Sequence, residues 1–313
     1  MTIVKKYEDL ITSKEQTRAG FITFALEKNR KSSPIIEDAK SFKVLASKAN
    51  TPSELQNIDE IRAAMITAAG LSDKSLKYFT EADKDKAIQE LITNFLEPVG
   101  VNFIDELIYR YLLIKGDSLG GSMRNLVGTI AEQKLIRSIL SCLSVKGDRS
   151  HYLSVKTKAW IAVPKDDYSF IEDVKALSWM GKTEERVLGF NLKVPIVGKN
   201  IDICLFNVDK ASYIKDNIVN TPSKILMLGE LKGGIDPAGA DEHWKTANSA
   251  LGRIRSSFKM SEVPILTSFA AAAIEKSMAS EIYAQLKSKE LDFAANITID
   301  TQLVEYCNWI LGL

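Results

Sequence analysis

The sequence has few cysteines, and they do not occur in a pattern that makes a familiar site. The three of them, Cys142, Cys204 and Cys307, are widely separated and form no CxxC pair. Neither a disulfide framework nor a zinc knuckle is therefore indicated. This usage of cysteine fits a protein of a reducing compartment.

A charge surplus and long apolar runs are also absent. The sequence contains 41 Lys and Arg residues and 40 Asp and Glu residues. This near balance argues against a protein that coats nucleic acid through charge alone. Basic residues gathered on one face remain possible. The N-terminus has no apolar leader, and the longest apolar run, 269–274, is too short to cross a bilayer. These absences favour a cytoplasmic protein without a membrane-spanning segment.

The first third of the sequence has the pattern of helices. Apolar residues recur at helical spacing over 55–65, 83–95 and 102–114, and no strand signal precedes residue 150. We expect residues 1–112 to form a helical subdomain and residues 113–313 to form a second domain. Between them, the glycine-rich stretch 115–125 is expected to be a loop that leads into an amphipathic helix.

Beyond residue 150, strand patterns are followed by helix patterns. Strands are expected over 153–163, 187–196, 200–208, 224–232 and 263–270, and helices over 241–258, 271–287 and 301–311. This order predicts an α/β fold with a central mixed sheet flanked by helices.

Two of the expected strands carry charged residues in unusual places. Asp202 is isolated among apolar neighbours, and Glu230 and Lys232 share one face at the end of another strand, before Gly233 and Gly234. If the strands pair, the three charged side chains converge, and two carboxylates suit Mg²⁺. Such a site can hydrolyse a phosphodiester, with Lys232 orienting or helping to deprotonate the water. The alternative is an ordinary inter-strand ion pair, and the strand ends followed by glycines favour catalysis.

These residues belong to longer sequence segments that resemble those of a known family. Asn200-Ile-Asp202 and the stretch Gly229-Glu-Leu-Lys-Gly-Gly-Ile-Asp-Pro-Ala-Gly-Ala-Asp-Glu-His-Trp-Lys-Thr-Ala247 are similar to the AvaI/BsoBI family of type II restriction endonucleases. The resemblance implies a PD-(D/E)XK catalytic core over 113–313 and a DNA-embracing helical subdomain over 1–112. It also implies a homodimer on double-stranded DNA and a cognate DNA methyltransferase as a functional partner without physical contact. The implied site is CYCGRG, cut after the first C to leave a 5′ overhang and 5′-phosphate ends.

The resemblance also assigns roles to residues of these segments. Asp202, Glu230 and Leu231 become ligands of the Mg²⁺ cofactor, and Lys232 becomes the catalytic lysine. His243 becomes the histidine near the scissile phosphate, where a neutral imidazole can accept a proton. The ordinary alternative for His243 is a partly exposed, hydrogen-bonded side chain at a helix start. Ile201 stands where the signature has proline, a departure that leaves the ligands in place.

Further residues are implied to contact DNA. Lys199 and Asp236 become base-contacting residues, which fits the chemistry of a C·G pair: lysine donates to guanine, and carboxylate accepts from cytosine N4. Lys74 is the candidate base contact in the helical region. Arg124, in the glycine-rich stretch, is a candidate phosphate contact, although a plain helix start explains it equally well. Glu132 is interpreted as a solvated helix residue, with an outer carboxylate of the site as the alternative.

Two other functions compete with a restriction endonuclease. One is a structure-specific DNA repair nuclease of the same fold, and the other is a non-catalytic helical DNA-binding protein. The clustered Asp202, Glu230 and Lys232 argue against the last, because a binding module has no need of carboxylates that face phosphate. Incubation of plasmid DNA with the protein and Mg²⁺ separates the three.

Overall fold

The computed structural model describes residues 4–165, 167–215 and 217–313, apart from the side chains of residues 124 and 125. The chain divides into two compact units. The sheet unit holds the chain up to Phe21 together with Val127–Leu313, and the helical unit is Ile22–Leu126. A compact unit of the structure need not be a domain that folds or acts independently. The expected division into domains 1–112 and 113–313 therefore stays a prediction.

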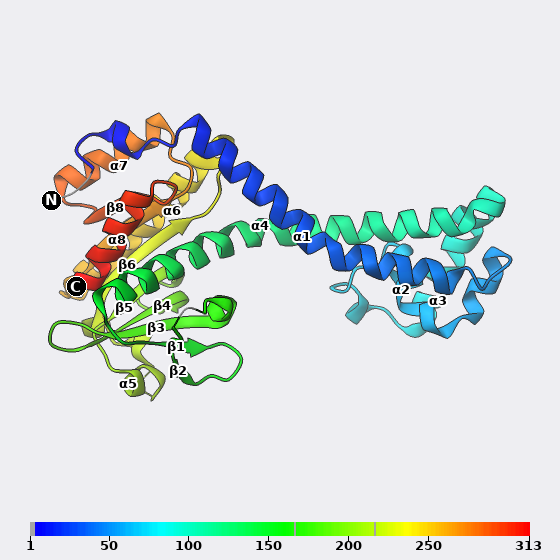
Figure 1. Ribbon diagram of the computed structural model, residues 1–313, viewed down its shortest axis with the longest axis horizontal. Helices are drawn as coiled ribbons and strands as arrows, with labels where there is room; N and C mark the ends of the chain where they lie inside the picture. The colour runs from blue at the N-terminus through cyan, green and yellow to red at the C-terminus, as the bar shows by residue number, and fades with distance from the viewer. Residues whose placement is uncertain (1–3, 166, 216) are drawn as a thin grey trace. The chain divides into compact units, whose positions relative to one another are not determined.

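One mixed sheet forms the centre of the sheet unit (Figure 1). Its eight strands lie in the order β2-β1-β3-β4-β5-β6-β7-β8. Neighbours from β2 to β6 are antiparallel, whereas β6, β7 and β8 run parallel. The bounds are β1 Ser150–Ser154, β2 Trp160–Ala162, β3 Val174–Met180, β4 Glu185–Val194, β5 Lys199–Phe206, β6 Ile225–Lys232, β7 Leu266–Ala271 and β8 Phe293–Asn296.

Helices cover both faces of this sheet, as Figure 1 shows. Helices α6 (Pro237–Met260) and α7 (Lys276–Ser288) connect the parallel strands and pack with one buried cluster, which includes Trp244. The C-terminal half of α4 (Phe103–Lys146) and α8 (Asp300–Gly312) pack with the other, which includes Tyr306. Helix α5 spans Lys210–Lys215. The expected mixed sheet flanked by helices is confirmed.

The helical unit has a core of its own. It contains most of α1 (Lys14–Ala46), then α2 (Arg62–Ala68), α3 (Glu81–Leu91) and the first part of α4. Helix α3 begins with a capping box, in which Thr80 accepts from the Asp83 amide and the Asp83 carboxylate accepts from the Thr80 amide. The expected lack of strands before residue 150 holds for the described residues. None of the helices described combines the length and apolar character that spanning a bilayer needs.

Short turns of helix complete the structure. They are Tyr7–Leu10, Pro52–Asn57, Asp59–Ile61, Leu76–Tyr78, Glu97–Asn102, Ser169–Asp173, Ile218–Asn220 and Pro222–Lys224, all 3₁₀, and the π-helical turn Ile92–Leu96.

The glycine-rich stretch 115–125 is not the loop expected from the sequence. It lies inside α4, which continues without a break from Phe103 to Lys146. Each helical glycine costs about 1 kcal/mol relative to alanine. Ending one helix and nucleating a second is also unfavourable, whereas propagation adds a hydrogen bond per residue. Strong helical segments on both sides therefore carry the helix through its glycines.

Two strands were missed in the sequence, the expected strand 153–163 is the hairpin of β1 and β2, and one helix begins later than expected. Strand β3 is buried on both faces, with only Lys175 and Met180 exposed, so it shows no clean alternation. Strand β8 has four residues and two alanines, which have low β-propensity. Residue 271 still belongs to β7, and α7 begins at Lys276.

Candidate active site

The two charged strands are neighbours in the sheet. Ile203 on β5 pairs with Gly229 on β6 in antiparallel register. Asp202 and Glu230 lie one residue beyond this pair, on strands whose facing side chains point the same way. The backbone amide of Leu231 donates to Asp202 Oδ2 over 2.8 Å, which fixes the aspartate against β6. The sheet thus brings together the two carboxylates singled out in the sequence.

Lys232 joins the two carboxylates. Its Nζ donates to Asp202 Oδ2 over 2.9 Å and to Glu230 Oε2 over 2.7 Å. The Glu230 side chain is 5% exposed, and those of Lys232 and Asp202 are 19% and 25% exposed. The expected convergence of Asp202, Glu230 and Lys232 is therefore found, in a largely buried ion triad whose open side is at Asp202.

Burial and mutual charge determine how the triad titrates. Burial and, after it, the charge of Asp202 raise the pKa of Glu230 to about 7, against the opposing effect of Lys232. Burial alone would lower the pKa of Lys232, but Asp202 and Glu230 together raise it above its ordinary value. Lys232 is consequently a fixed cation near neutral pH, and it cannot accept a proton from water.

A third acidic side chain approaches this triad from α4. Glu132 is half-buried, and burial followed by the charge of Asp202 raises its pKa to about 7. Asn191 on β4 donates its Nδ2–H to Glu132 Oε2 over 2.5 Å and opposes this rise. The preferred interpretation of Glu132 as a solvated helix residue is therefore wrong, because Glu132 interacts with Asp202 and Asn191 instead.

A divalent ion and protons should compete for these carboxylates. The pKa of Glu230 and that of Glu132 are about 7 in the fold, against 4.5 ordinarily. Both carboxylates therefore hold a proton more tightly in the folded than in the unfolded state. The stability that this proton binding gives the fold is fully present below about pH 4.5 and is lost as pH rises through about 7. Because an ion that binds only the folded state adds stability, we expect Mg²⁺ to raise the unfolding midpoint more at pH 8 than at pH 6. Thermal unfolding with and without Mg²⁺ measures this, and equal shifts at both pH values would contradict it.

The glycines after β6 are required by close neighbours. A Cβ on Gly233 would lie 2.3 Å from the carbonyl oxygen of Val127 on α4, so this helix passes directly against the end of the strand. A Cβ on Gly234 would lie 3.0 Å from Nε2 of His243. His243 is an exposed residue of α6, and its imidazole therefore packs against the turn that follows Lys232.

The donor set fits a magnesium ion. Carboxylate oxygens are the ligands Mg²⁺ prefers, and it keeps several waters, so one or two carboxylates suffice. Leu231 can contribute only its backbone carbonyl, because its side chain is buried and its amide is bonded to Asp202. Among the described residues, no group of three or more His, Cys, Asp or Glu side chains is arranged to hold an ion together. Asp202 and Glu230 would therefore hold it as a pair.

The remaining residues implied to contact DNA are spread along the chain. Lys199 is exposed at the start of β5, and Lys74 is exposed in a turn of the helical unit. Asp236 is exposed and caps α6, where its Oδ1 accepts from the Ala238 amide over 3.0 Å. The Arg124 side chain lies outside the described residues.

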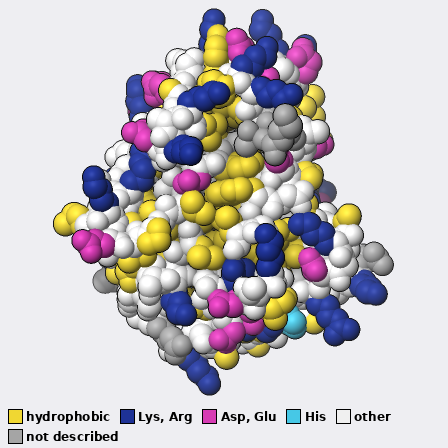
Figure 2. All heavy atoms as spheres, turned by 90° about the vertical axis from the view of Figure 1, so that its left-hand side faces the viewer, with side chains coloured by type: hydrophobic (Ala, Val, Ile, Leu, Met, Phe, Trp, Pro, Cys, Tyr) yellow, Lys and Arg dark blue, Asp and Glu magenta, His cyan; other side chains and the backbone are white. Residues whose placement is uncertain are grey.

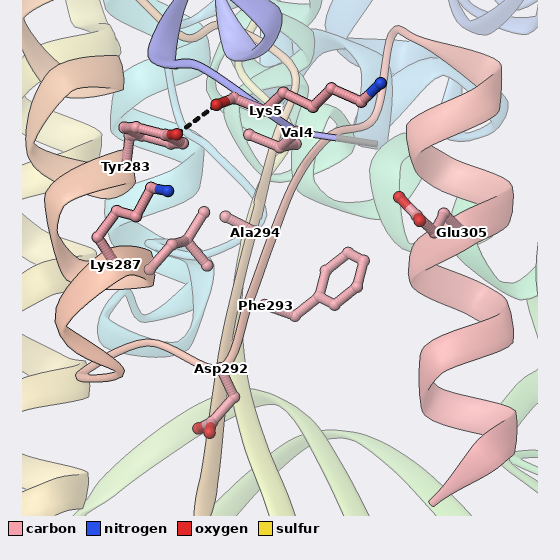
Figure 3. A pocket seen from close by; sticks show the side chains of 9 residues that line it. Val4, Lys5, Tyr283, Lys287, Asp292, Phe293, Ala294 and Glu305 are labelled. Atoms are coloured by element: carbon pink, nitrogen blue, oxygen red, sulfur yellow. Dashed lines mark hydrogen bonds between the residues drawn. The ribbon is translucent and has the colours of Figure 1, made fainter. Parts of the chain in front are cut away.

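On the face in Figure 2, lysine and arginine are interspersed with aspartate and glutamate. A cavity of about 430 Å³ lies between α7, β8 and α8. Figure 3 shows the side chains that line it. The Tyr283 hydroxyl donates to the Lys5 carbonyl there, and none of the triad residues lines it. The triad therefore stays the candidate site for phosphodiester hydrolysis.

Comparison with known proteins agrees with this geometry. The model of the family described as restriction endonuclease BsobI matches residues 2–313. The chain belongs to this family. It is 50% identical over 313 residues to the type II restriction enzyme BsoBI of Geobacillus stearothermophilus, covering 99% of the chain and 97% of that protein. The type II restriction enzymes AvaI of Nostoc sp. and of Anabaena variabilis are each 46% identical over 310 residues, 99% of the chain and 98% of theirs. Membership of the BsobI family makes the chain a restriction endonuclease, as the sequence resemblance predicted.

Proposed function

We propose that this protein is a Mg²⁺-dependent type II restriction endonuclease that cuts double-stranded DNA at CYCGRG. Cleavage after the first C would leave 5′ overhangs and 5′-phosphate ends. The observation that carries the proposed chemistry is the contact of Lys232 with both Asp202 and Glu230 on adjacent strands. The proposed site rests on the resemblance to AvaI and BsoBI. Such an enzyme would act in the bacterial cytoplasm, where its DNA substrate is.

Each residue of the site would have a distinct part in the reaction. When bound by Asp202 and Glu230, Mg²⁺ would neutralise phosphate charge and lower the pKa of a water. Lys232, held in its protonated form, would stabilise the negative charge that builds on the phosphoryl oxygens. His243 would take the proton of the attacking water as the new P–O bond forms and the bond to the 3′ oxygen breaks. The 5′-phosphate follows from breaking that bond.

Recognition would use residues outside the triad. Lys199, Asp236 and Lys74 would contact bases, and Arg124 would contact phosphate. The site is a palindrome, which two subunits related by a two-fold axis read symmetrically. The protein would therefore act as a homodimer in which each subunit cuts one strand. A cognate methyltransferase would protect the host site without contacting the nuclease.

Plasmid digestion tests the function directly. A plasmid with several CYCGRG sites should yield discrete fragments with Mg²⁺ and remain intact with EDTA. A smear or random nicking would favour a structure-specific nuclease. Binding without cutting would favour a non-catalytic DNA-binding protein.

Asp236 allows base recognition to be separated from helix capping. Serine caps a helix well but is too short to replace the carboxylate at a base, whereas alanine does neither. Both Asp236→Ser and Asp236→Ala should lose about 1–3 kcal/mol of discrimination at one C·G pair. Only Asp236→Ala should also lose stability, by about 1 kcal/mol. The measurements are kcat/KM on cognate and singly altered duplexes, and urea unfolding. Normal specificity in Asp236→Ser would leave Asp236 with the structural role alone.

A further inference from the structure

Asn191 has an unusual backbone for a residue in the middle of a strand. Its φ is 52°, in the left-handed region, although β4 is extended on both sides of it. The register with β5 is the same before and after, with Phe190 opposite Ile203 and Leu192 opposite Ile201. Asn191 therefore stands opposite Asp202. Asparagine is among the few residues that tolerate this conformation, which is nonetheless less favourable than the extended one.

The side chain of Asn191 contacts Glu132 on helix α4. Its Nδ2–H donates to Glu132 Oε2, 59 positions earlier in the chain, and so links β4 to α4. Within the described residues, Glu132 has no ion pair with a lysine or arginine. A neutral amide is thus what holds this half-buried carboxylate in its place beside Asp202.

The site as a whole has more acidic than basic groups. Glu132 lies near enough to Asp202 for the two charges to interact, and Asp202 shares Lys232 with Glu230. Among the described residues, Lys232 is the only cation that pairs with any of these three carboxylates. Like charges brought together out of water cost free energy unless a cation offsets them. When ionised, the triad alone has one carboxylate in excess of its lysine, and Glu132 adds a second, an excess that a divalent ion would balance.

We propose that Asn191 is a positioning residue that holds Glu132 as a third, outer carboxylate of the candidate metal centre. The proposal rests on the function proposed above. Glu132 does not join Asp202 and Glu230 in a ligand group, so it acts on the ion through its charge and through water. Outer groups of this kind typically change metal affinity by about 10–100-fold when they are removed.

Two substitutions isolate this role. Asn191→Gly keeps the left-handed backbone and removes only the amide donor. Glu132→Gln removes the charge at nearly constant shape. Asn217→Gly is the matched control, because Asn217 is also left-handed, with φ 44°, and lies in an exposed turn elsewhere. Thermal unfolding in EDTA reports any loss of fold that is independent of metal.

The measured quantity is the affinity for Mn²⁺, which replaces Mg²⁺ because it can be followed by EPR. It is measured on the protein alone and on the protein with a duplex of unrelated sequence. Asn191→Gly and Glu132→Gln should each weaken Mn²⁺ binding about tenfold or more, and Asn217→Gly should not. Because Asn191 acts through Glu132, the double variant should bind no more weakly than Glu132→Gln alone.

A failure of the proposal for Asn191 and Glu132 can be distinguished from a failure of the proposed function. Normal Mn²⁺ affinity in Glu132→Gln, or additive losses in the double variant, would overturn the proposal for Asn191 and Glu132. If Asp202→Asn still abolishes Mn²⁺ binding in that case, the proposed function stands. A wild-type protein that binds no Mn²⁺ would overturn both.

Discussion

Asp202→Asn and Glu230→Gln should each reduce DNA cleavage by at least about 10³-fold. Either change removes one of the two charged oxygen ligands, and a bound metal ion contributes several kcal/mol of transition-state stabilisation, of which about 4 kcal/mol corresponds to 10³-fold in rate. The fold should persist, because the new amide is close in shape to the carboxylate. At position 202 its oxygen can still accept from the Leu231 amide.

Single-turnover cleavage in Mg²⁺ and DNA binding in Ca²⁺ measure the two consequences separately. Binding should stay within a few-fold of the wild type, since the loss belongs to the chemical step. Glu172→Gln, which removes an exposed carboxylate far along the chain from both strands, is the matched control and should cut normally. Near-normal cutting by either Asp202→Asn or Glu230→Gln would refute the assignment of the metal ligands.

His243→Ala should lower the cleavage rate by about 10²–10⁴-fold, the usual range for general base catalysis. Lys232 is unavailable as a base, because Asp202 and Glu230 raise its pKa despite the opposing effect of burial. A neutral imidazole, in contrast, accepts a proton near physiological pH. The rate should therefore fall in His243→Ala although Asp202, Glu230 and Lys232 are intact.

The chain contains one other histidine, which provides the control. The Nδ1 atom of His151 lies 3.4 Å from Lys210 Nζ, outside the triad, and His151→Gln should keep the rate. Saturating Mg²⁺ is needed throughout, so that a change in metal binding does not mask the loss of the base. A His243→Ala enzyme that retains its rate would assign the base to another group, such as the DNA phosphate.

The triad could be predicted because its signal is local. Side-chain alternation places Glu230 and Lys232 on one face of β6, and Asp202 interrupts an apolar strand. Only the pairing of β5 with β6 had to be assumed, and the structure contains it. Their functional roles stay predictions, which the substitutions above test.

The sequence left two interpretations open for Glu132 and gave no signal for Asn191. A glutamate on an amphipathic helix gives the same sequence pattern whether it meets water or Asp202, and its partner Asn191 is 59 positions away. The left-handed φ of Asn191 has no signal inside a strand pattern either. The glycines of α4 gave a misleading signal, because local turn propensity was outweighed by continuation of a long helix.

Sequencing of cleaved DNA ends tests the central claim most directly. A library of duplexes with randomised hexamers, incubated with the protein and Mg²⁺, would be captured by its new 5′-phosphate ends. The account predicts that all cut molecules carry CYCGRG and are cut after the first C on both strands, with no product from Asp202→Asn. Ends scattered over unrelated sequences, or products that persist in Asp202→Asn, would contradict it.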